Sequence, residues 1–186
     1  MNKRRTLLLT LTAFIILSLF IVWRYPCLLS QNSIVINVDY PGYASLKEMT
    51  QSVDAIIVGR VEAIHSRSWS ELPSTTFNIT VLQIVKPSTF NQSKILVTQG
   101  GYDYECRTAD VSGDPLMNVG EKYLFFLLKW RNEDGTLRPE YIRSMGGLSM
   151  FLVRDDKVYP RYESWSPSVS GMTVDNLVKE LETYLN

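Results

Sequence analysis

The chain has 186 residues, of which 45% are hydrophobic and 20% charged, and its formal net charge is zero. This composition is typical of a globular protein, and the length suits one domain with an appended segment better than two full domains. Four of the 19 basic residues lie within the first 24 positions, which leaves 15 basic against 19 acidic residues in the rest. A mildly acidic body lacks the clustered Lys and Arg of a phosphate-binding groove, which excludes nucleic acid as a partner.

The N-terminal segment predicts a membrane anchor. An uncharged run of seventeen residues begins at Leu7 and ends at Trp23, which is just long enough for a helix to cross a hydrocarbon core of about 30 Å. A cleaved signal has a shorter apolar run of about 7 to 15 residues and a small-residue cleavage site after it. No such site follows here, so we expect an uncleaved signal-anchor. Three basic residues before the run and one after it predict a cytoplasmic N-terminus and an extracytoplasmic body.

We therefore expect a single-pass protein of the cell membrane in three parts. Residues 1–30 form a basic cytoplasmic stub and a transmembrane signal-anchor, residues 31–43 a lead, and residues 44–186 an extracytoplasmic domain. Cys27 and Cys106 are the two cysteines, and one disulfide can join them in an oxidising compartment. The position of Cys27 in a flexible lead favours unpaired cysteines instead. The residues before Cys27 also lack the small and aliphatic pattern of bacterial lipoprotein processing.

The first elements of the predicted domain are short. Residues 34–38 predict an edge strand. Ser45, followed three residues later by Glu48, forms a capping-box pattern before apolar residues at helical spacing, and this predicts a short helix. From Asp54 the residues become β-branched and then alternate between apolar and polar, which indicates a strand. Gly59 within that strand predicts a bend or a bulge.

The middle of the chain predicts three more strands, of which the last is the most apolar. A polar loop over residues 66–75 precedes strands at residues 76–85 and 95–98, and a long connection spans residues 102–118. The eight residues from Tyr123 to Trp130 then contain a single charge. A strand that is apolar on both faces must be covered on both faces. We therefore expect this strand at the centre of the fold.

The last third predicts a charged hairpin turn from Asn132 to Gly135, short strands at residues 141–145, 148–153 and 158–159, and a final helix. Thr173 can cap this helix, whose apolar residues recur on one face. Taken together, the segments predict a mainly β fold, namely a small antiparallel β-barrel with a short N-terminal helix and a C-terminal amphipathic helix packed outside it. Such a barrel also avoids long open strand edges.

Four motifs follow one another in a familiar order: DAIIVGRV at residues 54–61, FNITV at 77–81 leading to VKP at 85–87, ILVT at 95–98, and VGEKYLFF at 119–126. Over roughly residues 54–128 the chain resembles the OB-fold domains of the tissue-inhibitor-of-metalloproteinase and netrin-like superfamily, and more closely uncharacterised bacterial membrane-anchored extracytoplasmic proteins with this pattern. The resemblance implies an OB-like barrel. The inhibitors of the family chelate zinc through a free N-terminal cysteine. Here the corresponding region follows a membrane run and has no Cys-x-Cys, so that mechanism is not implied.

The sequence offers no catalytic set, metal site or cofactor site. His65 is the only histidine and lies among polar residues of a predicted loop, so a triad that uses it is not expected. A zinc site needs three or four Cys and His ligands at close spacing. The acidic residues of the long connection lack the spaced pattern of a calcium loop; they are Asp103, Glu105, Asp110 and Asp114.

Aromatic and charged residues in two predicted loops are the candidates for binding. They are Tyr102, Asp103, Tyr104 and Glu105 in one loop, and Arg161, Tyr162 and Trp165 in the other. Exposed Tyr, Trp and Arg carry much of the binding energy at protein surfaces, although the same rings can pack over the barrel ends as a lid. The sequence thus favours a membrane-tethered binding or interaction module without catalysis, for a protein or small-molecule partner. The alternative is a cell-surface hydrolase that uses loop carboxylates such as Asp103 and Glu105.

Overall fold

The computed structural model describes residues 14–20, 32–37, 43–86, 92–143, 149–161 and 169–186. The chain divides into two compact units. The first comprises Met1–Ile34 and Asp103–Thr108, and the second comprises Val35–Tyr102 and Ala109–Asn186.

In the first unit, residues 14–20 are helical, and their apolar side chains are exposed, Phe14 by 70%. No helix among the described residues is long and apolar enough to cross a membrane. Most of the predicted anchor between Leu7 and Trp23, together with the basic stub before it, lies outside the described residues. The anchor therefore stays a prediction.

The tip of a short hairpin carries Cys106. Strand β5 (Tyr102–Tyr104) is joined to β6 (Arg107–Val111) by Glu105 and Cys106, whose φ angles are 49° and 64°. Two successive left-handed residues are the geometry of a tight two-residue hairpin turn. Cys106 is disulfide-bonded, although the sequence favoured unpaired cysteines. Cys27, the other cysteine of the chain, lies outside the described residues.

Strands β5 and β6 belong to a small three-stranded sheet of order β1-β6-β5, in which β1 is Asn32–Ile36. The predicted edge strand is therefore present, shifted by two residues. The sequence predicted only a long connection over residues 102–118 and missed the two strands within it. Strands of three and five residues are too short for an alternating pattern to stand out, and β6 pairs with a segment about 75 positions earlier in the chain.

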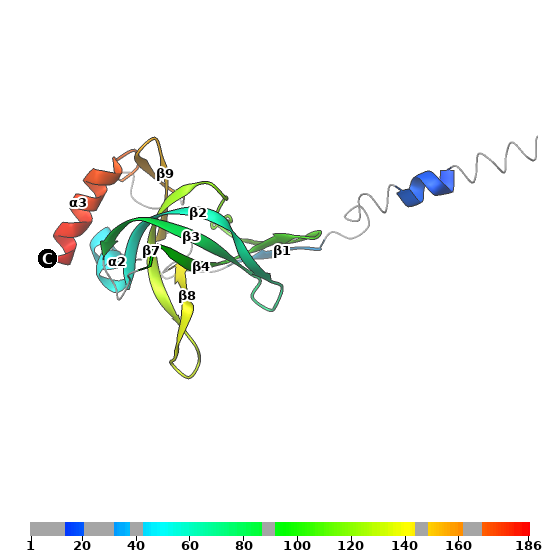
Figure 1. The fold of residues 1–186 in the computed structure, drawn as a ribbon, viewed down its shortest axis with the longest axis horizontal. Coiled ribbons are helices and arrows are strands. Elements are labelled where there is room, and N and C mark those ends of the chain that lie inside the picture. Colours follow the sequence, from blue (N-terminus) through cyan, green and yellow to red (C-terminus); the bar gives the residue numbers. More distant parts are fainter. Residues whose placement is uncertain (1–13, 21–31, 38–42, 87–91, 144–148, 162–168) are drawn as a thin grey trace, which may run out of the picture. The chain divides into compact units, whose positions relative to one another are not determined.

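The second unit is built on a sheet of order β10-β9-β7-β2-β3-β4-β8 (Figure 1). Its strands are β2 (Ala55–Ser68), β3 (Ser74–Lys86), β4 (Lys94–Gly100), β7 (Lys122–Arg131), β8 (Leu137–Arg143), β9 (Met150–Arg154) and β10 (Lys157–Pro160). The fold is mainly β, as predicted. The prediction of an all-antiparallel barrel was wrong in two respects, because β4 and β8 run parallel and because the sheet is not a closed barrel.

The sheet curls because β8 pairs on one side with β4 and on the other with β7. The contact with β4 is limited to Val97↔Tyr141 and Thr98↔Ile142. Strand β7 divides its outer edge between two partners, since its first half pairs with β9 and its second half with β8. Strands β9 and β10 therefore continue the sheet outward instead of closing it.

Strand β7 is the central strand that the sequence predicted. Tyr123, Leu124, Phe125, Phe126 and Leu127 are fully buried. The first, third and fifth of these side chains join the core between the curled strands, while the other two join the core beneath the helices. Each face of the strand is thus covered by a different layer, as expected for an apolar run of period two.

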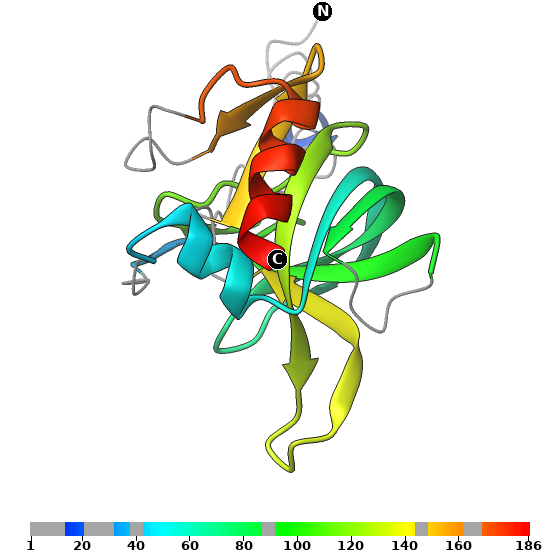
Figure 2. The same cartoon turned by 90° about the vertical axis from the view of Figure 1, so that its left-hand side faces the viewer.

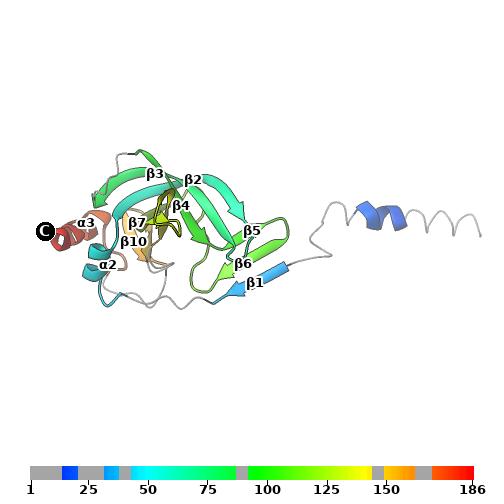
Figure 3. The same cartoon turned by 90° about the horizontal axis from the view of Figure 1, so that it is seen from below.

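Two helices lie on the same side of the sheet (Figures 2 and 3). They are α2 (Leu46–Ser52) and α3 (Val174–Leu185). The capping box is confirmed, because Ser45 Oγ accepts from the backbone N–H of Glu48 at 3.1 Å and Glu48 Oε2 accepts from that of Ala44 at 2.8 Å. The cap of α3 is also confirmed, since Thr173 Oγ1 accepts from the N–H of Asn176 at 3.3 Å.

The bend or bulge predicted at Gly59 is confirmed as an irregularity in the pairing of β2 with β3. The pairing of β2 with β3 shifts register between Val58 and Gly59, and a Cβ at position 59 would lie 2.5 Å from Ile79 Cγ2. A side chain there would force the buried β3 strand away. Beyond the bend, β2 and β3 run further than predicted, so that the loop between them shrinks from the predicted residues 66–75 to residues 69–73.

Candidate functional site

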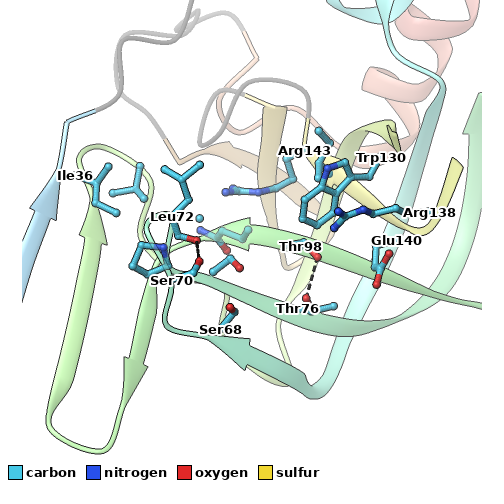
Figure 4. Close-up of a pocket in the computed structure, with 16 residues that line it drawn as sticks. Ile36, Ser68, Ser70, Leu72, Thr76, Thr98, Trp130, Arg138, Glu140 and Arg143 are labelled. Atoms are coloured by element: carbon cyan, nitrogen blue, oxygen red, sulfur yellow. Dashed lines mark hydrogen bonds between the residues drawn. The ribbon is translucent and has the colours of Figure 1, made fainter. Parts of the chain in front are cut away.

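A pocket of about 600 Å³ lies in the second unit (Figure 4). This volume falls within the range of about 300 to 1,000 Å³ that small-molecule sites occupy. The floor of the pocket is the face of β3 and β4 that points away from the core. Side chains alternate along a strand, so Ser74 and Thr76 line the pocket while Phe77 is buried in the core.

The floor is rich in hydroxyl groups. Thr76 of β3 lies opposite Thr98 of β4, and their Oγ1 atoms are hydrogen-bonded at 2.8 Å (Figure 4). Ser74 of β3 lies opposite Gly100 of β4, and both also line the pocket. Polar hydroxyls without large side chains leave an open, hydrogen-bonding surface above the two strands.

One wall of the pocket is the loop that joins β2 to β3. Ser70 Oγ donates to the carbonyl of Leu72 at 3.2 Å, and Leu72 is 76% exposed beside the pocket. A ring contact supports the same loop, because the rings of Trp69 and Tyr102 pack edge to face with their centres 5.0 Å apart. Tyr102 was predicted as a binding residue. It is buried, and it supports the loop instead of lining the pocket.

The opposite wall comes from the end of β7 and from β8. Arg138, Glu140 and Ile142 occupy alternate positions of β8 and face the pocket with Trp130. The Arg138 guanidinium lies 4.2 Å from the centre of the Trp130 ring, and its Nε donates to Asn132 Oδ1 at 2.5 Å. The indole and the guanidinium therefore form a fixed pair, which Figure 4 shows across the pocket from Leu72.

Glu140 is half-buried and faces the same space. Among the described residues it has no hydrogen-bond or ion-pair partner. Its carboxylate oxygens are therefore available to accept hydrogen bonds from a ligand.

A buried ion pair lies at the inner end of the pocket. Both terminal nitrogens of Arg143 donate to the Asp114 carboxylate, and the bond from Nη1 to Oδ1 is 2.7 Å long. The side chains of Arg143 and Asp114 are only 2% and 1% exposed. Gln99 completes the network, since its Nε2 donates to Asp114 Oδ1 at 3.1 Å and to the carbonyl of Pro115 at 2.8 Å. The burial of two charged groups is tolerated here because each charge compensates the other.

One N–H donor of this network, the Nε of Arg143, has no acceptor among the described residues. Arg143 lines the pocket, and its Nε is buried without a hydrogen-bond partner within the described part of the chain. A buried N–H that is not satisfied costs about 1 to 3 kcal/mol. An acceptor oxygen that reached it from a ligand would remove that cost.

A second polar cluster surrounds the start of β7. The hydroxyl of Tyr123 donates to Glu121 Oε2 and accepts from the N–H of Asn118 at 3.2 Å. Burial and the hydrogen bond to Glu121 raise the pKa of Tyr123 to about 12, and the same hydrogen bond lowers the pKa of Glu121. These contacts fix the turn before β7, so the cluster is structural.

Arg161, another predicted binding residue, belongs to this second cluster. Its guanidinium lies 5.5 Å from the centre of the Tyr123 ring, and both terminal nitrogens donate to the carbonyl of Leu116 at 3.3 Å. Arg161 and Tyr102 therefore have different neighbours, and neither lines the pocket.

The remaining predicted residues lie elsewhere. Asp103, Tyr104 and Glu105 are exposed on the hairpin of the first unit, and Tyr162 and Trp165 lie outside the described residues. Their role in binding stays a prediction. His65 is exposed within β2 instead of in a loop. The described residues contain no group of three or more His, Cys, Asp or Glu side chains that could hold a metal ion.

The pocket residues on β8 and Trp130 were missed at the level of sequence. The signal available was weak. Arg138, Glu140 and Ile142 recur at period two just after the Asn132 turn, but an alternating polar strand reads as an ordinary solvent-facing edge. Only the approach of the loop before β3 turns that edge into a wall.

No protein-family model matches the chain, and a search of curated proteins finds no similar sequence. The function therefore has to be inferred from the chemistry of the pocket and from the fold that forms it.

Proposed function

We propose that the protein is a membrane-tethered, extracytoplasmic binding module without catalysis, and that its ligand occupies the pocket on the outer face of β3, β4 and β8. The observation that carries this proposal is the combination of a formed pocket with polar groups that converge on it. Glu140 and Arg143 both belong to its lining, and the Glu140 carboxylate and the buried Nε of Arg143 both lack partners among the described residues. A concave site with a few placed polar groups is the default form of a binding site.

We propose further that the curled sheet is an OB-like, partly open barrel. Successive pairings lead from β7 through β2, β3 and β4 to β8, which pairs again with β7, and the β4–β8 contact is parallel. In OB folds, ligands lie across the second and third strands and between the loops that follow the first and fourth strands. The corresponding positions here are β3, β4, the loop at residues 69–73 and the turn at residues 132–136. The pocket lies at this place, which supports the proposal by analogy of fold.

The proposed tether and compartment rest on two features. The uncharged run from Leu7 to Trp23, with basic residues mostly before it, favours a membrane anchor whose body faces outward. Cys106 is disulfide-bonded, and structural disulfides persist mainly in oxidising compartments. Both features favour an extracytoplasmic body.

The absence of catalysis is supported by the acid groups of the pocket. Glycoside and related hydrolysis usually employs two carboxylates that flank the bond to be cleaved. Glu140 is the one carboxylate among the described lining residues. Asp114 is buried in its ion pair with Arg143 and does not line the pocket. Asp103 and Glu105, the candidates for a hydrolase, are exposed outside this lining. A binding role therefore suits the site better than a hydrolytic one.

Filling the pocket tests the proposal. Thr76→Tyr places a ring on the pocket floor, while Thr80→Tyr makes the same change on the same face of β3, outside the lining. Ligand-observed NMR on the full-length chain would screen saccharides, short uncharged peptides, amino acids and lipid headgroups. We expect the unmodified chain and Thr80→Tyr to bind a shared ligand that Thr76→Tyr does not bind. Binding that both variants retain, or no binding at all, would contradict the proposal.

A further inference from the structure

We propose that the ligand of this pocket is a neutral saccharide. This inference rests on the proposed function and names the ligand class of the same site. It follows from three properties of the lining, namely its charge balance, its hydrogen-bonding groups and the surface that the ligand meets.

The charges of the pocket cancel. Arg138 and Glu140 lie two positions apart on the same face of β8, and Arg143 is matched by Asp114 at the inner end. A ligand with a net charge would bring an unbalanced charge into a half-enclosed site and would lose hydration that nothing replaces. The balance therefore favours a ligand that has no net charge.

The hydrogen-bonding groups require a ligand that both donates and accepts at close spacing. Glu140 only accepts and Arg143 Nε only donates, while the Ser74 hydroxyl can do either. Thr76 and Thr98 can both accept, and one of their two hydroxyl hydrogens is already used in the hydrogen bond between them. A sugar hydroxyl is a donor and an acceptor in one group. Several such hydroxyls on one ring match the row of serine and threonine side chains on the floor.

Each wall carries apolar groups beside its polar ones. Trp130 lies on one side and Leu72 on the other (Figure 4), and Ile142 of β8 also belongs to the lining. A pyranose ring has hydroxyls around its edge and C–H groups on its faces, and flat aromatic rings offer large rigid surfaces for such contacts. Because Arg138 already packs on Trp130, the orientation of the indole is set before any ligand arrives.

An extended peptide suits this site less well. Peptides that add to a sheet bind through the unpaired backbone groups of an edge strand. Strand β3 pairs with both β2 and β4, and β4 pairs with β8 at Val97 and Thr98. On the floor at Thr76 and Thr98 the ligand therefore meets side chains on a sheet face instead of a free backbone edge.

Titration of the full-length chain with defined saccharides tests the inference. The chain would be kept in a detergent without a sugar headgroup, and the probes would be neutral di- and trisaccharides built from glucose, galactose or N-acetylglucosamine, beside uronic-acid and sulfated probes of the same size. Isothermal calorimetry would report binding. We expect at least one neutral probe to bind to the unmodified chain and to Thr80→Tyr, with binding lost in Thr76→Tyr.

A second pair of variants tests the role of the carboxylate. Glu140→Gln keeps the shape of the pocket and removes the charged acceptor, so we expect about tenfold weaker binding of the neutral probe. Glu133→Gln makes the same change in the exposed turn, outside the lining, and should leave affinity unchanged.

The outcomes separate the inference from the proposed function. If an uncharged peptide, a lipid headgroup or an acidic saccharide is the only class that Thr76→Tyr abolishes, the ligand class is wrong and the pocket remains a binding site. A neutral saccharide that binds equally well to Thr76→Tyr lies elsewhere on the chain, and the inference fails. If no class of probe binds to the unmodified chain, both the inference and the proposed function fail.

Discussion

The two faces of β3 and β4 differ in what they contribute to the protein. The inner face carries Phe77, Ile79 and Val97, which are at least 99% buried. The outer face of the same strands carries Ser74, Thr76 and Thr98, which line the pocket. Because neighbouring residues of a strand point in opposite directions, the residues that hold the fold together and those that shape the pocket alternate along one segment. Stability and binding should therefore be separable by substitutions only one position apart.

The sharpest test of this comparison is a pair of neighbouring alanine substitutions. Phe77→Ala empties a fully packed site in the core and should lower the free energy of unfolding by about 3 to 5 kcal/mol. Thr76→Ala removes one partly buried hydrogen bond to Thr98 and should cost about 1 kcal/mol. Urea unfolding measures both values. Equal losses would show that the outer face contributes to the fold as much as the inner face does.

Breaking the ion pair beneath the pocket should have the next largest effect. Arg143→Met leaves the Asp114 carboxylate buried without its partner, which should cost about 3 kcal/mol. Asp114→Leu combined with Arg143→Met removes both charges and should recover most of that loss, because no uncompensated charge is left. A double mutant as unstable as the single one in urea unfolding would mean that the pair is not what holds this end of the pocket.

A smaller loss of stability is expected at Gly59, where the inner face of the sheet has no room for a side chain. Gly59→Ala places a methyl group 2.5 Å from Ile79 Cγ2, and such overpacking should cost about 1 to 3 kcal/mol. Pairing it with Ile79→Ala, which removes Cγ2 itself, should give a double variant that loses less stability than the sum of the two single losses. Thermal unfolding of the three variants checks this. Additive losses in the double variant would contradict the proposed clash.

The smallest effect concerns Tyr123, whose ring lies in the core while its hydroxyl reaches Glu121. The pKa of Tyr123 is raised from its ordinary value of 10.0 to about 12. The folded state therefore keeps a proton that the unfolded chain loses first. Its contribution to stability is complete below pH 10 and is lost as the pH rises from 10 to 12. Tyr123→Phe should flatten this part of the curve of unfolding free energy against pH, and an unchanged slope would refute the assignment.

Several elements follow from short stretches of sequence, and the structure confirms them. The capping box at Ser45 and Glu48, the cap at Thr173 and the bend at Gly59 each depend on a few neighbouring residues. The apolar run of β7 needed only its own period to predict coverage on both faces. Such features are local, because capping, turn geometry and side-chain alternation act over a few positions of the chain.

Other features depend on pairings between distant segments and were predicted incorrectly or missed. The parallel contact of β4 with β8 and the strands β5 and β6 left no local signature. The aromatic residue Tyr102 read as an exposed binding group, yet its ring packs against Trp69 and is buried. Composition predicts that a tyrosine can bind a partner, but its neighbours decide whether it is free to do so.

The mainly β character of the body could be predicted from the sequence, together with its two capped helices and its central apolar strand, because each depends on residues that are close together in the chain. The position of the pocket could not be predicted, since it depends on how distant segments pack. Its floor, its two walls and the Arg143–Asp114 pair come from segments between residues 36 and 143, and the curl of the sheet brings them together. A surface that several distant strands share has no period or motif in any one of them.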